Sequence, residues 1–184
     1  MESQKLLSKE GAALVIIDIQ EKLFPHMAEK EQIAQNVAKL VRFAEIMKIP
    51  IVVTEQYPKG LGRTIPELRK LISGIQPIEK VEFNCFGSEE FRETLGKLEA
   101  KTLIITGMES HICVAQTAID GLGNGYAICI VADAVSSRSL SDKAIAIERM
   151  GRIGVTLVST EMLIYELLEK AGTPEFKEAL KLVK

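Results

Sequence analysis

Residues 102–133 read TLIITGMESHICVAQTAIDGLGNGYAICIVAD, and this stretch decides the fold class. The runs at 102–106 and 126–133 are continuously apolar, as expected for strands that are buried on both faces. Between them, the residues near 111–123 form a predicted helix. A strand, a helix and a second strand in succession make a right-handed crossover that places both strands parallel in one sheet. The stretch therefore predicts an α/β fold with helices on both faces of a parallel sheet.

The same alternation of strand and helix extends through the rest of the chain. The run ALVIID at 13–18 precedes a predicted helix at 28–48, in which apolar residues recur at helical spacing. Pro50 ends that helix, and IVVT at 51–54 forms the next strand. The stretch EQYPKGLGRTIPE at 55–67 is rich in Pro and Gly, which predicts a long loop over the carboxyl edge of the sheet. The remaining predicted elements are a helix near 141–151, a strand at 155–159, a helix at 160–171 and a short helix at 172–180 that Thr173 caps.

The composition is that of a globular protein, and a chain of 184 residues suits one domain, so we expect a single domain over residues 1–184. The formal net charge of −2 gives no reason to expect a nucleic acid partner, and no apolar run is long enough to span a membrane. The N-terminal stretch MESQKLLSKEG lacks the apolar segment of a secretory signal, which favours a cytoplasmic location. Reduced thiols are then the simplest state of the three cysteines.

Cys113 lies where the strand at 102–106 gives way to a helix. One interpretation is packing, because free cysteine is a small and commonly buried residue. The other is a nucleophile, because unpaired backbone N–H groups in the first turn of a helix stabilise a thiolate and an oxyanion. Ser110 is the candidate N-cap that would place Cys113 in that turn. Cys85 and Cys129 lack this setting and are assigned to packing.

Two other residues are candidates for chemistry beside Cys113. Asp18 closes the run at 13–18, where it either marks the point at which the strand meets water or presents a carboxylate to the ligand crevice. Lys80 lies in the semi-apolar stretch PIEKVEFNCFG, and a lysine held near a thiol could stabilise a thiolate and an oxyanion together. His111 is two residues from Cys113, and helical side chains at that spacing point in different directions, so we do not assign it as the base.

Three stretches together resemble the isochorismatase-like cysteine hydrolases, a superfamily that includes nicotinamidases, N-carbamoylsarcosine amidohydrolases and isochorismatase. They are ALVIIDIQEKLF at 13–24, IEKVEFNCF at 78–86 and ITGMESHICVAQTAIDGLGNGY at 105–126. The resemblance covers most of the chain. The stretches VTEQYPKGLGRT and ERMGRIGVTLVSTEMLIYEL look most similar to the isochorismatase domain-containing hydrolases.

The resemblance implies a three-layer, doubly wound α/β fold with a six-stranded parallel sheet, in a homo-oligomer. It implies a catalytic triad of Asp18, Lys80 and Cys113. In that triad Cys113 attacks a carbonyl carbon, Asp18 takes the thiol proton and returns it to the leaving group, and Lys80 holds the charges in place. The resemblance also implies a cis peptide between Met108 and Glu109, with the backbone N–H groups of Glu109 and Cys113 directed at the oxyanion.

The chain departs from the nicotinamidases at the position of their metal site. Nicotinamidases carry an Asp-x-His metal-binding motif after the second strand. In this chain the corresponding stretch is TEQYPKG at 54–60, which places Glu55 and Tyr57 near the positions of the two metal ligands. Because tyrosine is not a zinc ligand, we expect no metal and no other cofactor, and nicotinamide is a less favoured substrate.

The presence of Cys113 favours a metal-independent hydrolase that cleaves a small amide or related C–N bond through a covalent Cys113 intermediate. Two alternatives stay open: hydrolysis of a vinyl ether with Asp18 as the general acid, and an oligomeric binding protein that has lost catalysis. The expected partner is a small-molecule substrate, with no nucleic acid and no membrane. The candidate pocket residues are Gln20, Phe24, Gln56, Tyr57, Phe83 and His111.

Overall fold

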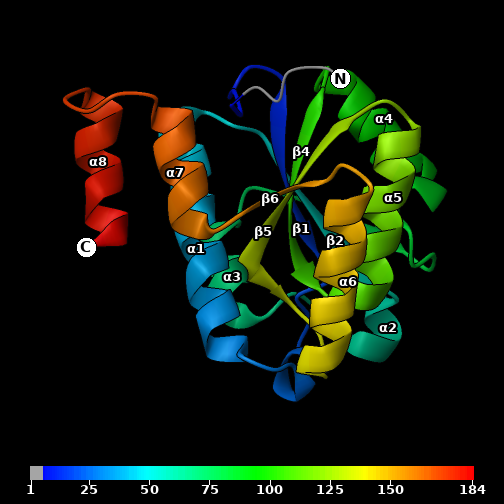
Figure 1. Ribbon diagram of the computed structural model, residues 1–184. Helices are drawn as coiled ribbons and strands as arrows, with labels where there is room; N and C mark the ends of the chain where they lie inside the picture. The colour runs from blue at the N-terminus through cyan, green and yellow to red at the C-terminus, as the bar shows by residue number, and fades with distance from the viewer. Residues whose placement is uncertain (1–5) are drawn as a thin grey trace.

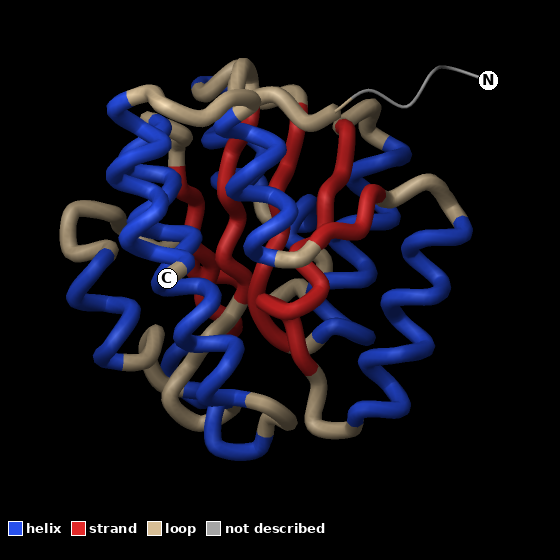
Figure 2. The backbone as a smooth tube through the Cα atoms, turned by 60° about the vertical axis from the view of Figure 1, so that its left-hand side comes forward, coloured by secondary structure: helices blue, strands red, loops and turns tan. Residues whose placement is uncertain are grey.

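The computed structural model describes residues 6–184; residues 1–5, part of the stretch in which we expect no secretory signal, lie outside the described residues. Six parallel strands form one sheet in the order β3-β2-β1-β4-β5-β6 (Figures 1 and 2). The strands are β1 Ala12–Ile17, β2 Ile51–Gln56, β3 Ile78–Lys80, β4 Thr102–Met108, β5 Ala127–Ser136 and β6 Thr156–Val158. The strand order reverses between β1 and β4, which confirms the predicted doubly wound α/β fold.

Helices cover both faces of the sheet and complete the three layers (Figure 1). One face carries α1 Lys30–Met47, α3 Pro66–Leu71, α7 Thr160–Leu168 and α8 Pro174–Val183, and the other carries α4 Glu89–Lys97, α5 Ala115–Gly123 and α6 Leu140–Arg152. Successive residues of β1 point to opposite layers, so that Leu14 and Ile16 pack on the α1 side and Val15 and Ile17 on the α5 side. Burial on both faces explains why the strands read as continuous apolar runs.

Shorter helical segments lie in the connections after the strands. They are the 3₁₀-helix η1 Phe24–His26, the helix α2 Pro58–Leu61, the 3₁₀-helix η2 Cys85–Gly87 and the π-helix η3 Ser110–Val114. None of the helices formed by residues 6–184 combines the length and the apolarity that a membrane span requires.

The predicted loop at 55–67 is wrong in part. The strand β2 continues to Gln56, Pro58 begins the short helix α2, and Pro66 begins α3. Both prolines stand at the first position of a helix, where the missing N–H costs nothing, so their presence did not exclude helix. The helix α4 was not predicted, although Ser88 caps it by accepting a hydrogen bond from the Phe91 backbone N–H at 3.4 Å.

Candidate active site

Four polar residues lie at the carboxyl ends of four neighbouring strands. Asp18 follows β1, Gln56 closes β2, Lys80 closes β3, and Cys113 lies in η3 directly after β4. Because these strands are parallel and adjacent, their carboxyl ends meet at one edge of the sheet, where open α/β sheets bind ligands. The fold thus gathers the three predicted triad residues in one crevice.

The Asp18 carboxylate is fully buried and accepts a hydrogen bond on each oxygen. The Thr54 hydroxyl donates to Oδ1 at 2.7 Å, and the Lys80 ammonium donates to Oδ2 at 2.7 Å. Asp18 has a left-handed backbone conformation with φ of 54°, which aspartate tolerates better than most residues. This buried carboxylate, bonded to groups from β2 and β3, does not simply mark the point where β1 meets water.

The Lys80 ammonium is also buried and uses three acceptors. Its Nζ donates to Asp18 Oδ2, to Gln56 Oε1 at 2.8 Å and to the Glu82 carbonyl oxygen at 3.2 Å. Burial alone would lower the pKa of Lys80, but the charge of Asp18, the neighbouring Cys85 and Cys113 and the hydrogen bond to Asp18 together outweigh this effect and raise the pKa above the ordinary lysine value. The crevice therefore contains a permanent ammonium next to a carboxylate.

Cys113 is 6% exposed, and its thiol lies close enough to the Asp18 carboxylate and the Lys80 ammonium for both charges to act on it. Burial raises the pKa of this thiol far above its ordinary value, the charge of Asp18 raises it further, and Lys80 lowers it only in part. The sequence suggested a thiolate stabilised by the start of a helix. In the folded chain, burial and the charge of Asp18 favour the neutral thiol instead.

Ser110 does not cap the helix that carries Cys113, contrary to the prediction. The π-helical turn begins one residue earlier, where the Glu109 carbonyl oxygen accepts hydrogen bonds from the N–H groups of Ile112 at 3.1 Å and Val114 at 3.2 Å. The buried Ser110 hydroxyl has no hydrogen-bond partner among residues 6–184. Cys113 therefore lies in a wide turn that precedes α5, and not in the first turn of α5 itself.

The approach of β4 to β1 beside this site depends on Gly107. Its φ is 121°, and a Cβ atom at this position would lie 2.1 Å from the carbonyl oxygen of Ile17. Only glycine fits there. The peptide that follows, between Met108 and Glu109, is cis, as the resemblance implied.

The other two cysteines differ in their relation to the site. Cys129 is completely buried in β5, and burial raises its pKa to about 12. Cys85 is also completely buried, and burial raises its pKa to about 11. However, Cys85 Sγ lies 4.0 Å from the Thr54 hydroxyl that donates to Asp18, so this thiol borders the crevice.

Gln20, a predicted pocket residue, is used instead to hold the backbone. Its Nε2 donates to the carbonyl oxygens of Gln56 at 3.0 Å and Gly62 at 2.7 Å, and its Oε1 accepts from the Gln56 N–H at 2.7 Å. The side chain is completely buried, and its amide is occupied on both sides. Gln20 therefore fixes the segment after β2, and this assignment corrects the prediction.

The remaining predicted pocket residues occupy different surroundings. Tyr57 and Phe83 are exposed, and Tyr57 lines a cavity that Lys80 also lines. Phe24 is only partly buried and packs against the core on the α1 side of the sheet. His111 is partly exposed, with Nδ1 2.8 Å from the Ser137 hydroxyl, so it does not contact Cys113 through that nitrogen.

Two cavities flank the crevice. The first, which we call the Lys80 cavity, has a volume of about 600 Å³ and is lined by Tyr57, Pro58, Lys59, Glu79, Lys80, Val81, Glu82, Gly87, Ser88 and Glu89. The second, the Arg138 cavity, has a volume of about 640 Å³ and is lined by Leu23, His26, Glu109 and Arg138. The first lies over β2 and β3, and the second over β1, β4 and β5.

The residues near the metal position of nicotinamidases have other partners here. Glu55 Oε1 accepts from the Thr64 N–H at 2.7 Å and hydroxyl at 2.8 Å, and Glu55 Oε2 forms an ion pair with Arg63 at 2.9 Å. Within residues 6–184, no group of three or more His, Cys, Asp or Glu side chains is arranged to hold a metal ion. The buried Glu55 carboxylate therefore fastens the segment that follows α2.

Comparison with known proteins agrees with the fold. The isochorismatase domain matches residues 12–162. The chain belongs to the isochorismatase family. It is 39% identical to isochorismatase domain-containing protein 2 of Danio rerio over 96% of this chain and 89% of that protein. It is 37% identical to isochorismatase domain-containing protein 2A of Mus musculus over 95% of this chain and 84% of that protein.

A solved structure is also similar over nearly the whole chain. The structure described as the MAR1 ribonuclease from Caenorhabditis elegans is 34% identical, with a TM-score of 0.91, and the match covers 97% of this chain and 92% of that chain. The earlier resemblance to isochorismatase-like proteins is thus confirmed at the level of family and fold.

Several residues of this isochorismatase-family site were missed in the sequence. Thr54 and Gln56 hydrogen-bond to Asp18 and Lys80, yet Thr54 appeared only as the end of an apolar run and Gln56 only as a pocket candidate. Their position at the carboxyl end of β2, beside β1, was the available signal. Arg138 lies in a stretch that the sequence indicates mainly as a loop, and its ion pair with Glu109 at 2.7 Å could not be predicted, because the pairing depends on β4 and β5 being neighbours.

Proposed function

We propose that this protein is a metal-independent cysteine hydrolase that cleaves a small amide or related C–N bond through a covalent intermediate on Cys113. The observation that carries the proposal is the buried pair of Lys80 and Asp18, 2.7 Å apart, with the Cys113 thiol close enough to the same carboxylate for its charge to raise the thiol pKa. A nucleophile with a base beside it, the base being held in turn by a third group, is the arrangement that covalent catalysis requires.

In the proposed reaction the thiol begins protonated. Asp18 accepts the proton of Cys113 as Sγ attacks the carbonyl carbon of the amide, and the C–N bond then breaks as Asp18 gives the proton to the leaving nitrogen. Water next attacks the thioester carbon and transfers a proton to Asp18, the C–S bond breaks, and Asp18 returns the proton to sulfur. Lys80 stays protonated throughout, because its pKa is raised, and it keeps the carboxylate in place.

The oxyanion that forms at the carbonyl needs hydrogen-bond donors. Glu109 directly follows β4 and begins the turn that carries Cys113. This position beside the nucleophile supports the proposed role of the Glu109 N–H, together with the Cys113 N–H, as an oxyanion donor.

RNA is a second substrate class to consider, because the similar Caenorhabditis elegans structure is described as a ribonuclease. The charges that line the Lys80 cavity are those of Glu79, Glu82 and Glu89 against those of Lys59 and Lys80. A polyanionic backbone is bound mainly by surplus positive charge, which this lining lacks. A small amide is therefore the better match.

The test is release of ammonia or amine from a panel of small primary amides, imides and N-carbamoyl compounds, with a vinyl ether and a short RNA beside them. We expect C–N cleavage that Cys113→Ala abolishes and that the matched variant Cys85→Ala retains. An acyl adduct on Cys113 should be detected by mass spectrometry during turnover. If Cys113→Ala retains full activity while Asp18→Asn loses it, acid-catalysed vinyl-ether cleavage replaces the proposal. If the protein only binds members of the panel, the binding-protein alternative replaces it.

A further inference from the structure

The hydroxyl of Ser110 is the exception among the buried polar side chains of residues 6–184. Ser110 is completely buried, and its Oγ has no hydrogen-bond partner among these residues. The other buried serines and threonines each hydrogen-bond through the side chain, as Thr160 does to Asp133 at 2.9 Å. Burying a hydroxyl without a partner is costly, so a site that keeps one calls for an explanation.

The Ser110 side chain does not support the turn in which it lies. The turn begins at Glu109, whose carbonyl oxygen accepts its first hydrogen bonds, and the Ser110 carbonyl oxygen accepts from the Ala115 N–H. These are all backbone bonds, and an alanine at position 110 would form them equally well. The hydroxyl therefore has its full hydrogen-bonding capacity available for a molecule that enters the site.

Ser110 and Cys113 lie on the buried side of the same turn. Both are buried in η3, whereas His111 and Ile112 between them are only partly buried. Side chains three residues apart in a helical turn are neighbours, with their Cβ atoms about 5–6 Å apart. A π-helical turn is also a frequent feature of functional sites. The free hydroxyl thus belongs to the surroundings of the proposed nucleophile.

The second half of the proposed reaction needs a water molecule that is held beside the Cys113 thioester. A water in a buried polar site makes two to four hydrogen bonds, so one contact with Asp18 is not enough to orient it. The Lys80 ammonium already donates to three acceptors, and the Thr54 hydroxyl already donates to Asp18. Ser110 is the nearby hydroxyl that is not committed in this way.

We propose that the Ser110 hydroxyl holds the water that hydrolyses the Cys113 thioester, which makes Ser110 a further catalytic residue. This inference rests on the proposed function and concerns its second half. The water donates one hydrogen bond to Asp18 and the other to Ser110 Oγ, which leaves a lone pair of its oxygen for the acyl carbon. The O–C bond forms as the water proton moves to Asp18, the C–S bond then breaks, and Asp18 gives the proton to sulfur. Ser110 keeps its own proton throughout.

The two halves of the reaction then depend on different residues. Formation of the thioester uses Cys113 and Asp18 and involves no water, so it does not need Ser110. Hydrolysis of the thioester needs the water in a fixed orientation, and orienting a reactant is a large part of catalysis in general. Removing the Ser110 hydroxyl should therefore slow the second half alone and make the acyl intermediate accumulate.

The first experiment separates the two halves with 4-nitrophenyl acetate, which acetylates a thiol and releases coloured 4-nitrophenolate. The initial burst of colour measures acetylation of Cys113, and the later steady rate measures hydrolysis of the acetyl group. We expect Ser110→Ala to leave the burst rate unchanged, to lower the steady rate at least about tenfold and to raise the fraction of acetyl-Cys113 seen by mass spectrometry. The matched control is Thr160→Val, which removes a buried hydroxyl that has a partner and should change neither rate.

The second experiment supplies a nucleophile that does not depend on a held water. Hydroxylamine attacks the same thioester and gives acetohydroxamate in place of acetate. In Ser110→Ala, hydroxylamine should restore turnover, and the ratio of acetohydroxamate to acetate should rise about tenfold relative to the unmodified protein. Thermal unfolding is measured beside it. Ser110→Ala should not lower the unfolding temperature, because the hydroxyl that it removes has no partner, whereas Thr160→Val should lower it.

The outcomes distinguish this inference from the proposed function. If acetyl-Cys113 forms and is hydrolysed equally fast in Ser110→Ala, the inference is overturned and the cysteine nucleophile stands. If Ser110→Ala slows both halves equally, or lowers the unfolding temperature without changing the product ratio, Ser110 only supports the turn, and the inference is again overturned. If the unmodified protein forms no acetyl-Cys113, the nucleophile itself is contradicted, and the role of Ser110 falls with it.

Discussion

The Lys80 ammonium lies 2.7 Å from the Asp18 carboxylate, and both side chains are completely buried. Removing two charges from water is costly, and their mutual attraction offsets that cost only when further hydrogen bonds satisfy both groups. Here the Thr54 hydroxyl donates a further hydrogen bond to Asp18, and Gln56 Oε1 accepts a further hydrogen bond from Lys80. A paired charge that is this expensive and this well satisfied is better explained by chemistry than by stability.

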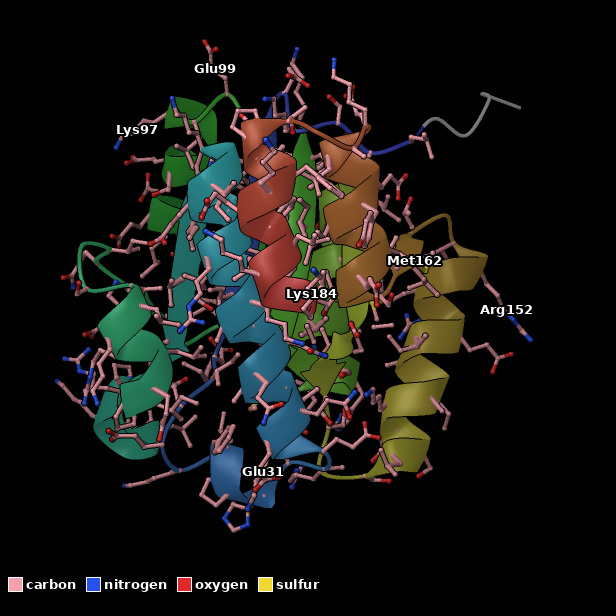
Figure 3. All side chains as sticks on the ribbon, turned by 90° about the vertical axis from the view of Figure 1, so that its left-hand side faces the viewer. Glu31, Lys97, Glu99, Arg152, Met162 and Lys184 are labelled. Atoms are coloured by element: carbon pink, nitrogen blue, oxygen red, sulfur yellow. The ribbon has the colours of Figure 1, made fainter. Side chains whose placement is uncertain are left out.

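Removing one member of this pair should destabilise the protein strongly. Lys80→Met leaves the Asp18 carboxylate buried without its cation, so we expect a loss of roughly 3–5 kcal/mol in the free energy of unfolding. The matched control is Lys97→Met, which breaks an exposed ion pair with Glu93 and should cost less than about 1 kcal/mol. Figure 3 shows Lys97 at the surface of α4. Urea denaturation of both variants measures the difference, and equal losses would contradict the buried-pair argument.

The Asp18→Asn variant should affect turnover and thiol reactivity in opposite directions. The charge of Asp18 raises the pKa of Cys113, so its removal should lower that pKa and speed alkylation by iodoacetamide between about pH 7 and 9. The same change removes the proposed base, so turnover should fall by a factor of about 10² or more. Alkylation rates across pH, read by mass spectrometry at each cysteine, check the first effect.

In the unmodified protein, Cys113 should show no fast alkylation below the ordinary thiol pKa of about 8.5, because burial and Asp18 both favour the neutral thiol. Cys129, whose pKa burial raises to about 12, is the internal reference for an unreactive thiol. A rate for Cys113 that levels off near pH 6 would show that a thiolate exists at rest, and it would overturn the order of proton transfer proposed above.

The Gln56→Leu variant should reduce catalysis with little change in substrate binding. Gln56 Oε1 accepts one of the three Lys80 hydrogen bonds, and without it the ammonium is held less firmly against Asp18. We expect kcat to fall about 10- to 100-fold, the usual effect of losing a positioning contact, while KM changes little. Gln56→Glu restores an acceptor oxygen and should recover part of the loss, which a simple packing defect would not permit.

Much of the fold could be predicted because five of the six strands are long enough, or apolar enough, to be recognised from their own sequence without knowledge of their neighbours. The strand β3 Ile78–Lys80 spans three residues with an exposed centre, so no periodicity could reveal it, and only the resemblance implied a sixth strand. The helix α1 was predicted nearly to its ends because its buried stripe repeats over many turns.

The site was harder to predict, because its properties arise from contacts between distant segments. The sequence around Cys113 shows the start of a helix, which suggests a lowered thiol pKa. The raised pKa comes from burial and from Asp18, which only the pairing of β1 with β4 brings close. The hydrogen bonds between the Gln20 side-chain amide and the Gln56 backbone likewise depend on the path of the segment after β2, which the sequence does not reveal.

The homo-oligomer stays a prediction, and the sheet edge at β6 is where we expect contact. Large apolar side chains are exposed on both helices that flank this edge strand: Ile145 and Ile153 at α6, and Met162 and Tyr165 on α7. Figure 3 shows Met162 on the outer surface of α7. Light scattering should give a mass that is a multiple of 20.3 kDa, and Met162→Asp with Ile145→Asp should reduce it. A monomer at high protein concentration would contradict the prediction.

The contact between Gly107 and Ile17 allows a controlled test of how β4 reaches the site. Gly107→Ala places a Cβ 2.1 Å from a backbone oxygen that cannot move without breaking the sheet, so we expect a loss of more than about 4 kcal/mol in the free energy of unfolding. Gly154→Ala is the matched control, because Gly154 also has a positive φ, of 99°, but nothing lies within 4 Å of its added Cβ. That variant should cost only about 1–2 kcal/mol, the strain of a left-handed residue. The difference between the two variants measures the close approach of β4 to β1 separately from backbone strain, and similar losses would show that the approach is looser than described.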